Sequence, residues 1–109
     1  MSFNEVVRSF SEWPACTDAY EEIKNNCLQL AKTDPDNAAA YFLVFGFARS
    51  YVLLYDEEAV SEELAQRAKR QLTSYLDILA SAIADGSAPA RLSALNAVAF
   101  DYLQSERIF

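Results

Sequence analysis

The feature that most constrains this sequence is an almost unbroken apolar run from Ala38 to Tyr55, interrupted only by Gly46, Arg49 and Ser50. A helix that is apolar on every side is either the centre of a helical bundle or a membrane span. The run is short for a bilayer, which needs about 20 apolar residues, and it contains a charge. We therefore expect a central core helix over about 35–55 and no membrane segment.

Two amphipathic segments precede the apolar run. Ser2 and Glu5 have the spacing of a capping box and begin a helix that we expect to end near Glu12. Thr17 is the expected N-cap of a second helix, which continues to about Lys32. Apolar residues recur along this second helix at intervals of three and four: Tyr20, Ile23, Cys27 and Leu30.

A helix-start signal stands directly before the apolar run. Asp34 is the expected N-cap, and Pro35 takes the first helical position, where its missing N–H costs nothing. The stretch Asp34–Phe42 resembles the start of a tetratricopeptide repeat, in which an aspartate–proline turn leads into a helix with an aromatic residue, then leucine–glycine and tyrosine. Gly46 falls one residue later than in that pattern, and no second copy follows at a period of about 34 residues.

Two further amphipathic segments follow the apolar run. The fourth helix begins around Asp56, or at a cap at Ser61, and runs to about Ala84, with Gly86 suited to a left-handed stop. Its apolar stripe is Leu64, Ala68, Leu72, Tyr75, Leu76, Leu79 and Ile83. A fifth helix opens at 87–89, and its expected inner face is Leu92, Leu95, Ala99, Tyr102 and Leu103.

Together these patterns predict an all-α fold. No strand-type alternation flanked by turn residues is present, and the chain has only two glycines and three prolines. We expect a single domain over residues 1–109, a compact bundle of four to five helices around the central apolar helix. The last two residues, Ile108 and Phe109, either fold back on this core or join a partner.

The composition excludes several kinds of chemistry. The chain has no histidine, which rules out a Ser-His-Asp triad, a Cys-His dyad and any His-ligated metal. Its net charge of −7 disfavours a nucleic-acid binder that tracks phosphates. We expect no enzyme, no cofactor and no metal. With only Cys16 and Cys27, and no basic-then-apolar leader, reduced thiols and a cytoplasmic location are expected.

Two residues inside the apolar run are unusual there. Arg49 either recognises an anion or a partner from a pocket near a tyrosine, or packs its stem and reaches a surface carboxylate. Gly46 costs about 1 kcal/mol relative to alanine in a helix. Close approach of another helix is the expected compensation, and a ligand-facing hollow is the alternative.

An acidic segment follows the apolar run, with Asp56, Glu57, Glu58, Glu62 and Glu63 and no basic residue among them. These carboxylates are either solvated groups that favour a helix N-terminus or an acidic face for a basic partner. In the second interpretation, the candidate partner-binding residues are these five acids together with Arg49 and Tyr55.

Small size, acidity, many aromatic residues and no catalytic motif favour a binding protein. Our leading hypothesis is a small acidic cytoplasmic protein that occludes a basic protein partner, as bacterial toxin-immunity proteins and antitoxins cover a cognate toxin or effector. The alternative is a homo-oligomeric helical adaptor or secretion-chaperone-like protein that forms a homodimer through the apolar helix and the C-terminus.

Overall fold

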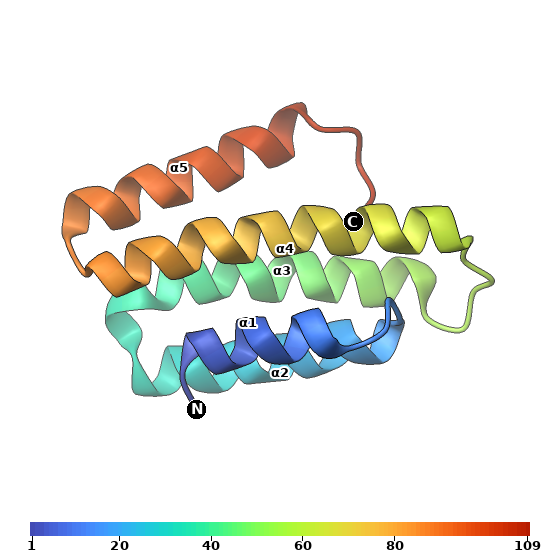
Figure 1. Ribbon diagram of the computed structural model, residues 1–109, viewed down its shortest axis with the longest axis horizontal. Helices are drawn as coiled ribbons and strands as arrows, with labels where there is room; N and C mark the ends of the chain where they lie inside the picture. Colours follow the sequence, from blue (N-terminus) through green and yellow to red (C-terminus); the bar gives the residue numbers. More distant parts are fainter.

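The computed structural model describes all residues 1–109 and consists of helices without strands. The helices are α1 (Phe3–Glu12), α2 (Thr17–Thr33), α3 (Ala38–Tyr55), α4 (Glu62–Asp85) and α5 (Ala88–Gln104), with a 3₁₀ turn at Pro35–Asn37. They pack as one bundle: α4 runs along the middle, α5 and α1 lie on either side of it, and α2 and α3 lie behind (Figure 1). The predicted all-α bundle is confirmed.

Local capping groups set several helix boundaries. The hydroxyl oxygens of Ser2, Ser61 and Ser87 each accept a hydrogen bond from the backbone N–H three residues later. Gly86 ends α4 in the left-handed region, with φ of 79°. Of the two predicted starts of the fourth helix, the Ser61 cap is therefore correct, and Asp56 lies in the preceding loop.

The start of α2 differs by one residue from the prediction. Cys16 is the N-cap, without a side-chain hydrogen bond, and Thr17 is already helical, so the predicted Thr17 cap is wrong. The reason is the turn after Pro14, whose carbonyl accepts the N–H of Cys16 at 2.8 Å and so directs the chain into the helix one residue early. The predicted stripe of α2 is buried, with Cys27 fully enclosed.

The start of the apolar helix also differs. Pro35–Asn37 forms a 3₁₀ turn, and α3 itself begins at Ala38. The Asp34 carboxylate makes no capping bond to the backbone and instead accepts hydrogen bonds from the Asn37 amide at 2.8 Å and the Tyr41 hydroxyl at 2.6 Å. These two donors lower the pKa of Asp34. Asp34 thus satisfies the phenol of Tyr41, a buried residue.

The core is built largely from aromatic rings. Tyr20 of α2 stacks on Tyr51 of α3, with ring centroids 3.8 Å apart and planes at 13°. Phe10 of α1 meets Tyr20 edge-on at 5.2 Å, so these rings join the first three helices. No charged residue is buried anywhere in the chain. The core is therefore held by apolar burial and ring contacts, without buried ion pairs.

The C-terminal residues fold back onto their own chain. Phe109 has no exposed surface, and its ring lies 5.4 Å from that of Phe47. The Tyr55 hydroxyl donates to the backbone carbonyl of Ile108 at 2.6 Å, and the Tyr102 hydroxyl donates to the backbone oxygen of Phe109. Of the two open alternatives for this tail, packing on its own core is the one observed.

The apolar helix α3 is enclosed on one side only. Val44, Phe47 and Tyr51 point into the core, whereas the opposite side of the helix is open to solvent. The segment Pro35–Tyr55 is long and apolar enough to cross a membrane by length and composition, a test that a core helix of a soluble protein also passes. Packing between α2 and α4 buries part of the apolar surface of α3 and leaves the rest exposed to solvent.

The inward side of α5 was predicted incorrectly in part. Ala94 and Val98 are buried, and Leu95, Ala99 and Tyr102 are half-buried. By contrast, 61% of Leu92 and 81% of Leu103 are exposed, so these two residues do not face the core. Apolar residues cover more than one side of α5, and helical periodicity alone does not select between them.

Candidate functional site

An exposed apolar surface lies on the open side of α3. Phe42, Gly46, Arg49 and Leu53 are spaced by three and four residues and share one side of the helix, with Leu54 next to them. Exposed fractions reach 70% for Phe42 and 74% for Leu53. We call these five residues the α3 surface. Contiguous exposed apolar side chains of this kind mark interaction sites in soluble proteins.

Gly46 does not mediate helix packing. A Cβ atom built at this position meets no other atom within 4 Å, so the predicted close approach of another helix is wrong. Gly46 instead lines a shallow hollow with its α3-surface neighbours and Arg107. The cost of a mid-helix glycine, about 1 kcal/mol relative to alanine, is therefore not offset by any contact within the chain.

Arg49 is exposed and has no carboxylate partner. The ion pairs in the chain are Lys24–Glu21 and Arg67–Glu106, so the surface carboxylate expected in one of the two alternatives for Arg49 is not observed. Arg49 lines the same hollow as Gly46. Arg107 lies at the same hollow, 3.5 Å from the Ser50 hydroxyl. Arg49, within the α3 surface, and Arg107, beside it, are thus two cationic groups that remain available to an anion from another molecule.

The acidic segment lies at the C-terminal end of α3. Asp56, Glu57 and Glu58 occupy the loop, and Glu62 and Glu63 the first turn of α4. All five are exposed, and none is in an ion pair. Glu62 and Glu63 lie in the first turn of α4, at the positive end of its helix dipole. These acids do not gather in a group of three that could hold a metal ion.

Glu57 adopts a conformation that side chains disfavour. Its φ of 62° lies in the left-handed region, and it is the one residue other than glycine with a positive φ. Such a conformation costs on the order of 1 kcal/mol in an ordinary residue. The loop therefore presents a glutamate where glycine or asparagine would be more stable.

Tyr55 lies between the α3 surface and the C-terminal tail. Its hydroxyl donates a hydrogen bond to the carbonyl of Ile108, while its half-buried ring borders a hollow with Leu54 and Glu58. Leu54 also borders the hollow that contains Phe42 and Gly46. The structure thus places Tyr55 and Glu58 at one hollow and Arg49 at another, and Leu54 borders both.

Sequence reasoning missed the apolar members of this region. Phe42, Leu53 and Leu54 are exposed, although the apolar run around them predicted burial. A second exposed set lies on α5, where Leu92, Phe100 and Leu103 share one side of the helix. No local signal separates these side chains from core residues, because α3 and α5 each carry apolar residues on several sides.

The cysteines add no reactive group to this region. Cys16 and Cys27 are both free thiols. Burial raises the pKa of Cys27 to about 12, so this thiol stays protonated at neutral pH.

No protein-family model matches this chain, and neither a curated protein nor a solved structure matches it.

Proposed function

We propose that this chain is a small acidic binding protein that covers the surface of a protein partner, of the toxin-immunity type. One observation carries the proposal. Leu54 of the α3 surface shares a hollow with Glu58, and all five exposed carboxylates that follow α3 have no cationic partner in the chain. An apolar centre beside a charged margin is the arrangement found in protein–protein interfaces.

The apolar centre has the residues to supply affinity. Burying a leucine or phenylalanine side chain against a partner contributes about 1.5–3 kcal/mol, and Phe42 and Leu53 are both largely exposed. The absence of a side chain at Gly46, between them, lets a partner approach the helix backbone closely. These residues would form the buried part of the interface.

Two locally unfavourable features support a role for this region in binding a partner. A glycine stands in the middle of α3 without a neighbour, and Glu57 holds a left-handed conformation. Each costs on the order of 1 kcal/mol. Departures of this kind gather at functional sites, where a partner supplies the compensating interaction.

The charges indicate the partner's chemistry. Carboxylates from Asp56 to Glu63 attract basic groups over a distance of about 8–10 Å in physiological salt and so speed the encounter. Arg49, next to the apolar centre, requires an acceptor or an acid from the partner. We therefore expect a basic protein with an apolar patch, such as a toxin whose active site handles a negatively charged substrate.

The test begins with the product of the neighbouring gene. Co-expression is expected to give a 1:1 complex and protection of the host cell. Leu53→Glu is expected to weaken that complex by at least about 30-fold, as at an interface hot spot. Ile78→Glu, at an exposed apolar position of α4, is the matched control and should change affinity little.

A pair of charge reversals tests the acidic segment. Glu58→Lys with Glu62→Lys should lower the association rate about tenfold at low salt, whereas Glu12→Lys with Asp77→Lys should not. The proposal is wrong if no complex forms with the adjacent product, or if neither Leu53→Glu nor the first charge reversal weakens the complex.

A second candidate function is a homo-oligomeric adaptor. The observation that favours it is the exposed set on α5, Leu92, Phe100 and Leu103, which the acidic segment does not adjoin in sequence. Light scattering of the isolated protein is expected to show a dimer that Leu103→Glu dissociates and Leu53→Glu leaves intact. A monomer at high concentration excludes this candidate.

A further inference from the structure

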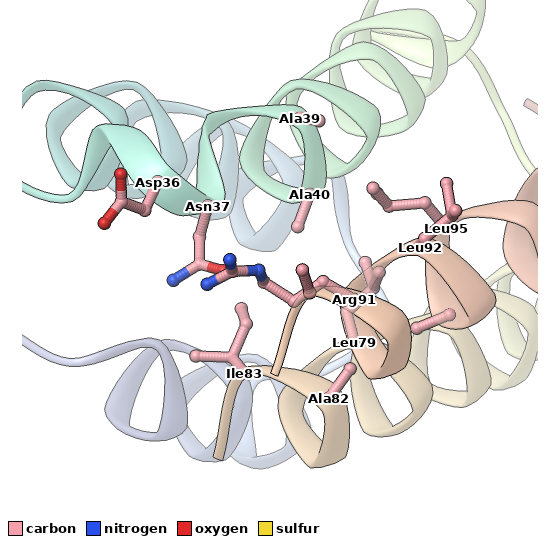
Figure 2. Close-up of a pocket in the computed structure, with 12 residues that line it drawn as sticks. Asp36, Asn37, Ala39, Ala40, Leu79, Ala82, Ile83, Arg91, Leu92 and Leu95 are labelled. Carbon is pink, nitrogen blue, oxygen red and sulfur yellow. The ribbon is translucent and has the colours of Figure 1, made fainter. Parts of the chain in front are cut away.

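An apolar cavity lies at one end of the bundle, where the beginnings of α3 and α5 meet the end of α4 (Figure 2). Its volume is about 190 Å³. Nine of the twelve residues that line it are hydrophobic, and the walls include Ala40, Leu79, Ile83 and Leu95. The cavity is therefore large enough for a small organic group and too small for a peptide segment.

Two polar side chains stand at the mouth of this cavity. The amide nitrogen of Asn37 donates to Asp34 at 2.8 Å, but its amide oxygen is buried and accepts no hydrogen bond. Arg91 is half-buried; its backbone N–H donates to Ser87, but its guanidinium makes neither an ion pair nor a hydrogen bond. In Figure 2 the side chains of Asn37 and Arg91 extend toward each other across the mouth. A buried acceptor and a guanidinium both lack partners at one opening.

The nearby carboxylates do not neutralise Arg91. Asp34 is engaged by Asn37 and Tyr41, and although Arg91 contributes to lowering its pKa, the two do not form an ion pair. Asp36 is exposed, and its carboxylate points away from the guanidinium (Figure 2). The N–H donors of Arg91 therefore remain free for an anion at the cavity.

We propose that this cavity binds a small carboxylic acid with an apolar body and a hydrogen-bond donor next to the carboxylate. The carboxylate pairs with Arg91, whose planar guanidinium suits a bidentate contact. The donor, an amide N–H or a hydroxyl, satisfies the oxygen of Asn37. A cavity of about 150 Å³ holds a benzene-sized group, so the space here fits a branched or aromatic side chain.

N-acetyl-L-leucine has all three features and is the probe for the experiment. Titration of ¹⁵N-labelled protein is expected to shift the backbone amide signals of Asn37, Ala40 and Leu92, which line the cavity. N-acetyl-L-leucinamide, which lacks the charge, should bind at least about tenfold more weakly. 4-Methylpentanoate, which keeps the charge but lacks the donor, should also bind more weakly than the probe.

Variants separate this cavity from the rest of the surface. Arg91→Gln should weaken binding of the probe at least about tenfold, and Arg70→Gln, at an exposed arginine of α4, should not. Ala39→Trp changes an exposed rim residue and should block entry without loss of the fold. The proposal is overturned if no signal shifts at about 10 mM probe, if acid and amide bind equally, or if Arg91→Gln binds like the native protein.

Discussion

α2 and α5 have the same length, 17 residues, but are attached to the bundle in different ways. α2 has five buried residues, among them Tyr20 and Ile23, and lies directly against α3. α5 has two, Ala94 and Val98, and leaves Leu92 and Leu103 in solvent. The helix with more apolar residues facing outward is therefore the one that the core holds less firmly.

Other contacts attach α5 to the bundle. The Tyr75 hydroxyl of α4 donates to Asp101 of α5 at 2.6 Å, and Gln71 donates to Ser105 at 3.2 Å. Phe109 fills the space beside Phe47 and Tyr102. Hydrogen bonds and the C-terminal tail thus hold α5 in the bundle, whereas α2 is held by the burial of its own side chains.

This difference between α2 and α5 indicates how the exposed apolar residues should be interpreted. On α2, the predicted apolar stripe is buried and Leu28 is the one large apolar residue left exposed, so the sequence pattern accounts for most of the packing. On α3 and α5, apolar side chains exceed what the monomer buries, and the excess is the surface that we assign to a partner. The predictions below test this contrast, from the largest expected effect to the smallest.

Phe109→Ala is expected to have the largest effect, a loss of about 3–5 kcal/mol in the free energy of unfolding. The reason is that Phe109 is fully buried and joins α5 to α3. Chemical denaturation measures the loss. Hydrogen exchange should show that amides of α5 lose protection before those of α2, and equal loss in both helices would contradict the contrast.

A matched pair of alanine substitutions tests burial in the two helices directly. Ile23→Ala in α2 should cost about 2–4 kcal/mol, because it leaves a cavity in a buried position. Leu103→Ala in α5 should change the free energy of unfolding by less than about 0.5 kcal/mol, because that side chain is exposed. Similar losses at both positions, measured by urea denaturation, would show that α5 is buried in solution.

Two buried tyrosines are expected to respond with opposite signs. Tyr75→Phe removes the hydrogen bond to Asp101 and should destabilise the protein by about 1–2 kcal/mol. Tyr20→Phe should instead stabilise it by about 1 kcal/mol, because the Tyr20 hydroxyl is buried without a partner. Thermal unfolding of both variants checks the signs. Destabilisation by Tyr20→Phe would mean that this hydroxyl has a partner in solution.

Gly46→Ala should have a small effect on stability, a gain of up to about 1 kcal/mol from helix propensity. The added methyl group meets no atom of the chain. If the α3 surface covers a partner closely, the same variant should bind that partner more weakly. A stability gain with unchanged binding would remove Gly46 from the proposed interface.

Much of the fold follows from local sequence. The start at Ser2 and the left-handed stop at Gly86 were predicted, Ser61 was one of two predicted starts of α4, and the opening of α5 at 87–89 was predicted, because each depends on residues within one helical turn. The buried stripes of α2 and α4 were predicted for the same reason, since polar residues cover their other sides. In these segments the local chemistry admits one arrangement.

The candidate site was predicted in part. The acidic segment and Arg49 stand out in the sequence because charge interrupts or follows an apolar run. Their apolar neighbours, Phe42 and Leu53, carry no such signal. The cavity near Arg91 also escaped prediction, since its walls combine the start of α3 with the junction of α4 and α5, which lies far from α3 in the chain.

The sequence by itself thus determined the helices, several of their ends and the sign of the surface, because capping, periodicity and charge are properties of neighbouring residues. Only the tertiary structure decided which side of α3 and α5 is buried, that Phe109 fills the space beside Phe47, and that Gly46 faces open solvent. The physical reason is that a helix with apolar residues on several sides can pack in several orientations. The choice among them depends on the volume and shape of side chains brought together from distant parts of the chain.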